Sequence, residues 1–260
     1  MTIDLAALDK SSERPPYRQI AAALRSAIQR GKLGPGDKLP SESELVEHFG
    51  VARMTARQAI QDLRSEGLVV SEHGRGVFVR SAPVVRRLAS ERFARRHRQQ
   101  GKAAFSVEAE KAGYTPGVDR LSVTEAPATL EIAERLGLAA GDTVVIRDRR
   151  YLANGEPVET AVSYIPADLA RGTAIVEHDT GPGGIYARLE DAGHVLDHFV
   201  EEVGARMPTP DERRALQLSA GVPVITLLRT AYDTAGRAVE VCDTVKAAYA
   251  YVLEYDFPAR

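Results

Sequence analysis

A short helix, a tight turn and a second helix, expected between residues 41 and 69, constrain the fold of this chain more than any other feature. The stretch LPSESELVEHFG places Ser41 three residues before Glu44, the capping-box spacing that fixes a helix start, and Gly50 ends that helix. In the next stretch, GVARMTARQAIQDLRSEGLV, apolar residues recur at helical spacing at Met54, Ala56, Ala59, Ile60 and Leu63. These positions predict a second helix that packs on the first.

The start of this second helix is polar and basic. Its first two turns contain Arg53, Thr55, Arg57 and Gln58. In a helix-turn-helix, the N-terminal residues of the second helix contact base edges in the major groove of DNA. Arginine suits the acceptors of guanine, and glutamine suits adenine. The alternative is that these side chains only form a solvated surface, as charged residues at helix starts often do.

The segments on either side complete a small domain. The stretch YRQIAAALRSAIQRGKL has apolar residues at helical spacing and precedes a glycine-rich stop. The stretch GLVVSEHGRGVFVR predicts two strands joined by a polar turn. Glycines in that turn let the backbone approach a DNA minor groove or phosphates, so the expected contacts are His73, Gly74, Arg75 and Gly76. Helices followed by such a hairpin form a winged helix.

Charge is distributed unevenly along the 260 residues. The net charge is +2 over residues 1–80, +6 over residues 81–102 and −10 over residues 103–260. This asymmetry suggests a nucleic-acid-binding part followed by a part with another task, although the arginines of residues 86–98 could simply solvate a linker. A single cysteine, Cys242, and the absence of an apolar run long enough for a signal peptide or a membrane span predict a soluble cytoplasmic protein.

From about residue 105 onward, strands and helices alternate. The stretch TVVIRDRRYLANGEPVETAVSYIP predicts two strands joined at Asn-Gly, the dipeptide most typical of a tight hairpin. A second long hairpin is expected in PVITLLRTAYDTAGRAVEVCDTVKAA, turning at Ala235 and Gly236. Hairpin-linked strands with interspersed helices predict an α+β domain with an antiparallel sheet. The expected boundaries are 13–80 for the winged helix, 81–104 for a basic, partly helical linker and 105–258 for this domain.

Two arginines in the first of these hairpins predict an anion site. Strand alternation places Arg147, Arg149 and Tyr151 on one face, and paired guanidinium groups offer donors suited to an anionic group. The alternative is that they face solvent and pair with nearby acids. No metal-ligand spacing, phosphate-binding loop or nucleophile–base motif occurs in the sequence, so neither a cofactor nor a metal is expected.

Residues 15–80 resemble the DNA-binding domain of GntR-type bacterial transcription regulators. Four motifs occur in order: G-x-x-L-P-S-E, R-M-T-x-R-Q-A, L-x-x-E-G-L and G-x-G-x-F-V. The resemblance implies a winged helix-turn-helix that binds a double-stranded operator as a homodimer. Two positions depart from the family and can alter operator preference. Ala52 replaces a frequent serine, and Ser43, an expected DNA contact, stands where the family has serine or a DNA-contacting arginine.

Residues 105–258 resemble the UTRA effector domain of the HutC subfamily, which shares its fold with chorismate lyase. The matching segments are NGEPVETAVSYIP, RTAYDTAGRAVEV and YVLEYDFPA. In the family, two arginines two residues apart grip the anionic group of the effector. Arg149 takes the first of these places and Tyr151 the second, and Ala104 replaces a frequent hydroxyl residue. The resemblance therefore implies a weakened phosphate grip and argues against a phosphosugar.

The same resemblance assigns the rest of the effector pocket. Glu240 matches a carboxylate that bonds effector hydroxyls or amines, and Lys246 stands where tyrosine is frequent. Ser163 and Tyr164 are expected to line the neighbouring strand. Together these features predict a transcriptional repressor that a small anionic or zwitterionic metabolite releases from a palindromic operator. The alternative is an enzyme that uses the lyase-like fold, against which the lack of catalytic motifs argues.

Overall fold

The computed structural model describes residues 5–9, 11–72, 74–80, 85–88 and 93–257. These residues divide into two compact units, one formed by residues 1–82 with 218–222 and one by residues 83–217 with 223–260. Each unit has a hydrophobic core of its own. Among the described residues, no helix has the length and apolar character that crossing a bilayer requires.

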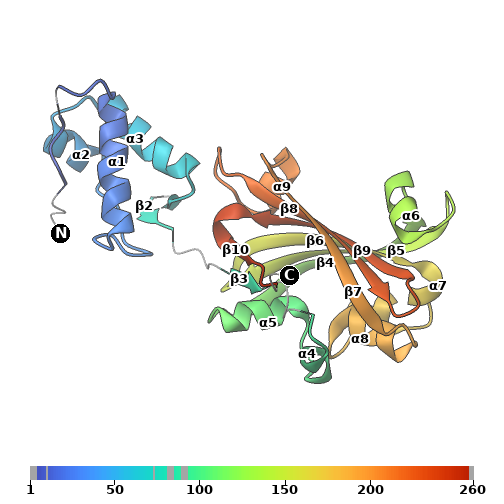
Figure 1. The fold of residues 1–260 in the computed structure, drawn as a ribbon. Helices are drawn as coiled ribbons and strands as arrows, with labels where there is room; N and C mark the ends of the chain where they lie inside the picture. The colour runs from blue at the N-terminus through green and yellow to red at the C-terminus, as the bar shows by residue number, and fades with distance from the viewer. Residues whose placement is uncertain (1–4, 10, 73, 81–84, 89–92, 258–260) are drawn as a thin grey trace. The chain divides into compact units, whose positions relative to one another are not determined.

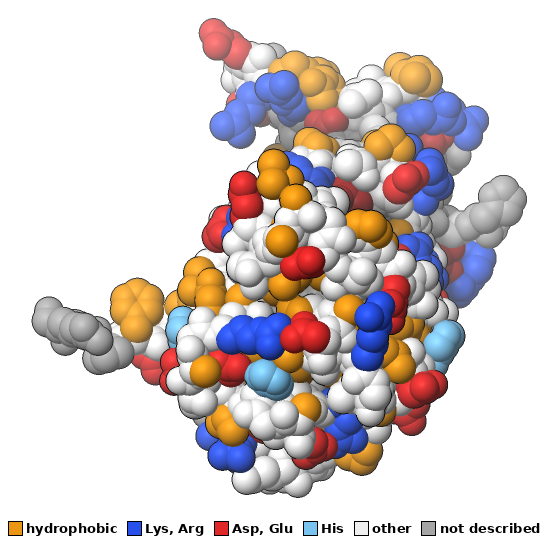
Figure 2. Space-filling model, turned by 90° about the vertical axis from the view of Figure 1, so that its right-hand side faces the viewer, with side chains coloured by type: hydrophobic (Ala, Val, Ile, Leu, Met, Phe, Trp, Pro, Cys, Tyr) orange, Lys and Arg blue, Asp and Glu red, His pale blue; other side chains and the backbone are white. Residues whose placement is uncertain are grey.

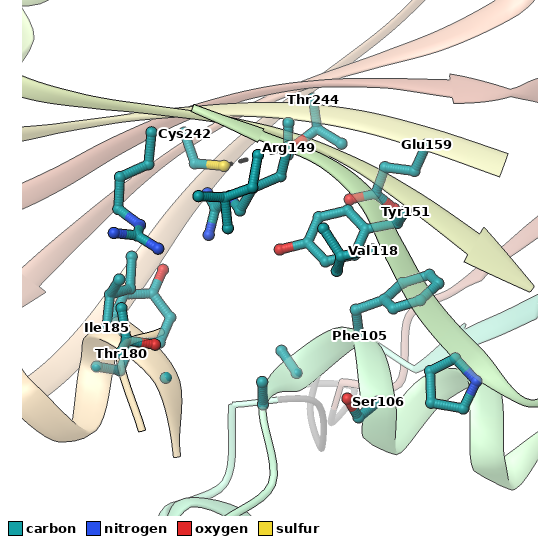
Figure 3. A pocket seen from close by; sticks show the side chains of 18 of the residues that line it. Phe105, Ser106, Val118, Arg149, Tyr151, Glu159, Thr180, Ile185, Cys242 and Thr244 are labelled. Atoms are coloured by element: carbon teal, nitrogen blue, oxygen red, sulfur yellow. Dashed lines mark hydrogen bonds between the residues drawn. The ribbon is translucent and has the colours of Figure 1, made fainter. Parts of the chain in front are cut away.

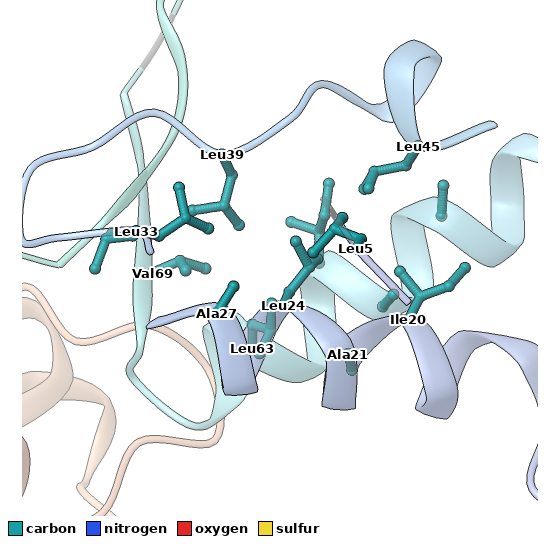
Figure 4. Packing of buried hydrophobic residues seen from close by; sticks show 14 residues of the cluster. Leu5, Ile20, Ala21, Leu24, Ala27, Leu33, Leu39, Leu45, Leu63 and Val69 are labelled. Carbon is teal, nitrogen blue, oxygen red and sulfur yellow. The ribbon is translucent and has the colours of Figure 1, made fainter. Parts of the chain in front are cut away.

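The described residues of the N-terminal unit form three helices and a two-stranded antiparallel hairpin (Figure 1). Its elements are α1 (Pro16–Gln29), α2 (Glu42–Phe49), α3 (Arg53–Ser65), β1 (Val69–Glu72) and β2 (Gly76–Val79). This arrangement confirms the winged helix that the sequence predicts. Buried aliphatic side chains from all three helices and both strands form one core, part of which Figure 4 shows.

Local interactions set the turn between α2 and α3. The Ser41 hydroxyl accepts a hydrogen bond from the backbone N–H of Glu44, and the Glu44 carboxylate accepts one from the N–H of Ser41. Gly50 ends α2 with a φ of 63°, a left-handed conformation that favours glycine. The expectation that Met54 packs in the core is wrong, because its side chain is 66% exposed. It lies two residues before Ala56, on the opposite side of α3 from the buried stripe.

A six-stranded antiparallel sheet forms the centre of the C-terminal unit, with strand order β4-β5-β6-β9-β8-β7. Its strands are β4 (Pro116–Pro127), β5 (Thr143–Ala153), β6 (Glu156–Pro166), β7 (Leu196–Arg206), β8 (Val224–Asp233) and β9 (Ala238–Ala247). Asn154 and Gly155 join β5 to β6, and both have positive φ angles, as the tight turn predicted from Asn-Gly requires. The antiparallel α+β class is therefore confirmed.

Helices cover both faces of this sheet (Figure 1). They are α4 (Arg95–Gln99), α5 (Ala104–Lys111), α6 (Leu130–Leu136), α7 (Ala167–Ala170), α8 (Gly184–Asp191) and α9 (Pro210–Ala215), with short 3-10 turns η1 (Ala174–Val176) and η2 (Ala248–Ala250). One face packs against α7, η1 and α8 through Val145 and Ile165. The other packs against α6 through Val144 and Val241. The alternation of side chains along each strand thus gives the sheet two separate cores.

Part of the segment expected to be a linker belongs to the C-terminal unit. Strand β3 (Val85–Leu88) pairs in parallel with β10 (Tyr251–Glu254), in a small sheet apart from the main one. Helix α4 accounts for the partly helical character that the sequence predicts. Residues 81–84 and 89–92 lie outside the described ranges. The six-stranded sheet therefore does not include β10, the last strand of the chain.

The face of the C-terminal unit in Figure 2 carries acidic and basic side chains close together, without a large area of one sign. Many charges of this unit form surface ion pairs, such as Arg171 with Glu125 and Arg237 with Asp168. A mixed surface of this kind gives little general attraction to a polyanion. The face seen here is therefore a poor candidate for contact with nucleic acid.

Candidate nucleic-acid interface and ligand pocket

The start of α3 presents the polar side chains that the sequence predicts as a DNA-contacting group. Arg53 and Arg57 are exposed, Thr55 is half-buried, and Gln58 is exposed and donates to Asp62 at 3.0 Å. Ser43, the second residue of α2, is also exposed. The buried stripe of α3 fixes its orientation on the core, so the opposite side of its first two turns faces outward.

Both arginines contact the same carboxylate, that of Glu42, and the sequence motifs do not predict this contact. Glu42 accepts hydrogen bonds from the Nε atoms of Arg53 and Arg57, each at 2.9 Å. The hydrogen bonds from Arg57 and then Arg53 lower the pKa of Glu42 to about 2. The carboxylate is therefore ionised at neutral pH. The P-S-E motif contains this residue, but nothing in the sequence indicates that it contacts residues eleven and fifteen positions later.

The tip of the β1–β2 hairpin is exposed at Gly74 and Arg75. Gly74 and Gly76 have φ angles of 71° and 125°, which a side chain would strain. A Cβ at Gly76 would also lie 2.7 Å from Cε of Lys38. The expected contact His73 lies outside the described residues. Arg75 pairs with Glu72. The tip thus presents one arginine between two glycines, whose lack of side chains leaves the backbone accessible.

The C-terminal unit contains a cavity of about 380 Å³ between the sheet and the starts of α5 and α8 (Figure 3). Arg147, Arg149 and Tyr151 of β5 all lie in its wall, as the alternation of side chains predicts. Arg149 lies over the ring of Tyr151, with its guanidinium carbon 5.8 Å from the ring centre. The structure thus brings together the three side chains of the predicted anion site.

The two arginines of this group have different surroundings. Arg147 is buried, and its guanidinium donates to the carbonyl oxygens of Ile175, Glu177 and His178. Burial and the neighbouring Arg149 lower the pKa of Arg147 to about 10, so it stays charged at neutral pH. Its donors hold η1 and the two residues after it in place. Arg149 donates to the Ser163 hydroxyl, and its Nε has no partner among the described residues.

Glu240 is fully buried in the same wall and belongs to an ion-pair network. Its Oε2 accepts hydrogen bonds from the Tyr186 hydroxyl and from Arg229 Nη2, the latter at 3.3 Å. Burial alone would raise the pKa of Glu240, but the charges of Arg229 and Arg149 and the hydroxyls of Ser163 and Tyr186 together outweigh burial, and the pKa is lowered. Oε1 has no hydrogen-bond partner in the described part of the chain. An ionised acceptor with a free oxygen in a cavity suits a ligand hydroxyl or ammonium group.

Two helix starts line the cavity without side-chain caps. The N-cap residues Ala103 of α5 and Gly183 of α8 make no side-chain hydrogen bond to their helices. The first backbone N–H groups of a helix lack intrahelical partners and favour negative charge. A Cβ at Gly183 would lie 3.1 Å from the carbonyl oxygen of Arg98, so a larger residue has little room there. With Arg149, these helix starts make the cavity favourable for an anion.

Three residues expected in the pocket do not line the cavity. Tyr164 follows Ser163 on β6 and therefore points to the opposite face, where it packs beside α6. Lys246 is fully buried and donates to Glu159, with its Nζ 4.2 Å from the centre of the Tyr251 ring. Lys246 therefore supports the pocket wall through Glu159 instead of lining the cavity. Ser163 also lies behind the wall, where it holds Arg149.

The segment expected as a linker contributes an aromatic residue that sequence reasoning missed. Phe93 lines the cavity, and the guanidinium carbon of Arg229 lies 4.5 Å from its ring centre. Phe93 also stacks on Phe199 of β7 at 4.2 Å between ring centres. Five residues later, Arg98 pairs with Glu190 of α8 at 2.8 Å. The segment after the N-terminal unit is therefore part of the pocket. No group of His, Cys, Asp and Glu in the described ranges could hold a metal ion.

Comparison with known families agrees with both units. A family model described as bacterial regulatory proteins, gntR family, matches residues 16–79, and the UTRA domain model matches residues 111–251. The chain belongs to the GntR family of bacterial regulatory proteins. Its C-terminal unit is a UTRA domain, so the architecture inferred from the sequence motifs is confirmed.

Full-length relatives of this GntR-family regulator share its architecture. It is 33% identical to an HTH-type transcriptional regulator of Streptomyces coelicolor, over 94% of this chain and 93% of the relative. It is 32% identical to the HTH-type transcriptional repressor NagR of Bacillus subtilis, over 92% and 93%. A crystal structure of a GntR-family transcriptional regulator, 30% identical, matches with a TM-score of 0.60 over 95% of this chain and 99% of that one.

The fold of PhnF from Mycobacterium smegmatis is also similar, with a TM-score of 0.60 at 24% identity over 93% of this chain and 100% of that one. The two family models and the full-length relatives show that the chain is a DNA-binding transcriptional regulator with a domain for a small-molecule effector. The alternative of an enzyme built on the lyase-like fold is not supported, because the family and its relatives are regulators.

Proposed function

We propose that this GntR-family regulator is a cytoplasmic repressor that binds a palindromic operator as a homodimer and leaves it when a small anionic or zwitterionic metabolite fills the UTRA cavity. The observation that carries the effector class is the meeting of Arg149 with two uncapped helix starts in one cavity. The free Oε1 of Glu240 provides an acceptor for a hydroxyl or ammonium group at the other end of the ligand. The repressor NagR, with the same architecture, supports the direction of regulation.

The DNA side of the proposal rests on the start of α3. In this proposal, base edges are contacted by Arg53, Thr55, Arg57 and Gln58, and the DNA backbone or the minor groove by Ser43 and the hairpin residues His73, Gly74, Arg75 and Gly76. One side of α3 is buried in the core, and the exposed arginines lie on the other side. A helix that reads the major groove requires this arrangement.

Replacing Arg57 by alanine is expected to weaken operator binding by about 1–3 kcal/mol, or roughly 5- to 150-fold, because it removes a base-contacting guanidinium. The operator can be selected from a random duplex pool with the wild-type protein and its affinity measured by fluorescence anisotropy at fixed salt. Arg64→Ala, which changes the same residue type in the last turn of α3, is the control and should bind nearly as wild type. Equal binding by Arg57→Ala and wild type would show that α3 does not read this operator.

The palindromic operator implies two readers related by a two-fold axis. The full chain has a mass of 28.2 kDa, and without DNA at micromolar concentration we therefore expect a species of twice that mass. Analytical ultracentrifugation measures this directly. A species with the mass of one chain at that concentration would count against the homodimer.

The response to the effector is proposed to pass through residues 85–104. Within the C-terminal unit, Phe93 touches Arg229 at the cavity, and Arg98 binds Glu190 of α8, whose first turn is also in the cavity wall. Upstream, buried Arg87 pairs with Glu201 and lies 3.7 Å from Glu108 of α5. A ligand that draws the starts of α5 and α8 together would shift this segment. It can change DNA affinity only if it favours one arrangement of the segment over another.

A further inference from the structure

Glu42 occupies a central place in the surface formed by α2 and the start of α3. Its Oε1 accepts from Arg57 Nε at 2.9 Å, and its Oε2 accepts from Arg53 Nε at 2.9 Å and from Arg57 Nη2 at 3.2 Å. The carboxylate side chain is 24% exposed, whereas the side chains of Arg53 and Arg57 are 71% and 54% exposed. One partly sheltered anion thus holds two outward-facing cations.

The position of this carboxylate is fixed by the fold. Glu42 is the first residue of α2, directly after the N-cap Ser41, whose capping box sets the start of the helix. The arginines lie one turn apart at the start of α3, so both side chains reach the same carboxylate. Its contacts therefore depend on the α2–α3 turn, which the buried core maintains.

The hydrogen bonds leave part of each guanidinium unused. Among the described residues, Nη1 of Arg57 and both Nη atoms of Arg53 have no hydrogen-bond partner. A guanidinium that is already oriented loses less side-chain freedom when it binds a base, and Arg–guanine contacts require a defined planar orientation. Holding the Nε edges of two arginines therefore directs their remaining donors outward.

The charge of Glu42 has a second consequence. Attraction between basic side chains and phosphates supplies most of the affinity for DNA of any sequence. A carboxylate between two arginines cancels part of that attraction and repels phosphates nearby. It therefore weakens binding to random DNA, while oriented donors strengthen binding to the correct bases. Both effects raise the ratio of operator affinity to random-sequence affinity.

We propose that Glu42 is a positioning residue for operator recognition, which holds Arg53 and Arg57 in the orientation that reads bases and suppresses binding to other DNA. This inference rests on the proposed contact of α3 with the operator. It predicts a function for the acidic residue of the P-S-E motif in discrimination between sequences, beyond its contribution to helix α2.

The test separates geometry from charge with two substitutions at one position. Glu42→Asp keeps the net charge but shortens the side chain, and Glu42→Gln keeps the length but removes the charge. Dissociation constants are measured at fixed salt on two duplexes of equal length, an operator selected with the wild-type protein and a random-sequence pool. Circular dichroism and thermal unfolding check that each variant folds.

A matched control lies at the other end of α3. Arg25 donates to Glu66, and this pair joins α1 to the C-cap of α3, roughly 20 Å along the helix from Arg53. Glu66→Gln removes the same charge and a comparable ion pair without touching the reading side chains. Its effect on the two duplexes should be equal.

The expected result for Glu42→Asp is an operator affinity about tenfold lower, with random-sequence affinity unchanged. Glu42→Gln should lose a similar factor on the operator and bind random DNA more tightly than wild type does. The proposal is overturned if both variants keep the wild-type ratio between the two duplexes, or if Glu66→Gln lowers that ratio equally. If Arg57→Ala also keeps the ratio, the placement of α3 on DNA is wrong, which is a separate failure.

Discussion

Replacement of Arg149 by alanine is expected to abolish the response at effector concentrations that release the wild-type protein, while operator binding without effector stays within about twofold of wild type. Arg149 supplies the charged donors at the centre of the cavity, and a hydrogen bond to a charged group contributes about 1.5–3 kcal/mol. Effector affinity should therefore fall roughly 10- to 100-fold. An effector is found first by a thermal-shift screen of phosphorylated and carboxylated metabolites, and operator affinity is then titrated with it by anisotropy.

The control for this substitution is the next residue of the strand. Arg150 points to the opposite face, where it pairs with Asp119 at 2.8 Å from Nε. Arg150→Ala should respond to the effector as wild type does, since it leaves the cavity unchanged. A normal response by Arg149→Ala would place the anion site elsewhere. Loss of operator binding without effector would instead show that Arg149 maintains the fold of the UTRA domain.

Lys246→Met is expected to lower the free energy of unfolding of the C-terminal unit by about 3–5 kcal/mol. Methionine keeps most of the volume, but the buried Glu159 carboxylate loses the ammonium group that donates to it. The Tyr251 hydroxyl still donates to Glu159 at 2.7 Å, but a hydroxyl does not neutralise the charge. Urea denaturation followed by circular dichroism measures the loss.

A second substitution tests the cause. Adding Glu159→Gln to Lys246→Met removes the buried charge and should restore much of the lost stability, so the two changes are not additive. An exposed pair in the same region, Arg86 with Glu254 at 2.8 Å, is the comparison, and Arg86→Ala should cost less than about 1 kcal/mol. Equal losses for the buried and exposed pairs would contradict the role given to Lys246.

The winged helix could be predicted almost completely from the sequence, because its determinants are local. The capping box at Ser41, the glycine that ends α2 and the 3.6-residue period of α3 act within a few residues of one another. The β5–β6 hairpin is predictable for the same reason, since Asn154 and Gly155 fix both the turn and the register of the strands. Strand alternation then placed Arg147, Arg149 and Tyr151 in one wall.

The features that could not be predicted depend on contacts between distant segments. Alternation indicates that Ser163 and Tyr164 lie on opposite faces, but the resemblance to UTRA domains assigned both to the pocket. The sequence does not show that Lys246 has a buried carboxylate partner 87 residues earlier. The basic character of residues 81–102 also does not show that one of these residues, Phe93, lines the cavity. The surroundings of such residues depend on tertiary packing, which the amino-acid composition does not describe.

The parallel pair of β3 and β10 is where the segment that follows the DNA-binding unit joins the effector domain. It joins only four residue pairs, Val85–Leu88 with Tyr251–Glu254, and shares no hydrogen-bonded ladder with the six-stranded sheet. A two-stranded ribbon of this length has little stability of its own, so its place in the domain depends on what its side chains contact. Buried Arg87 of β3 pairs with Glu201 of β7 and lies 3.7 Å from Glu108 of α5, so the first described strand after the DNA-binding unit is anchored on the effector domain, and a movement of α5 would reach that strand directly.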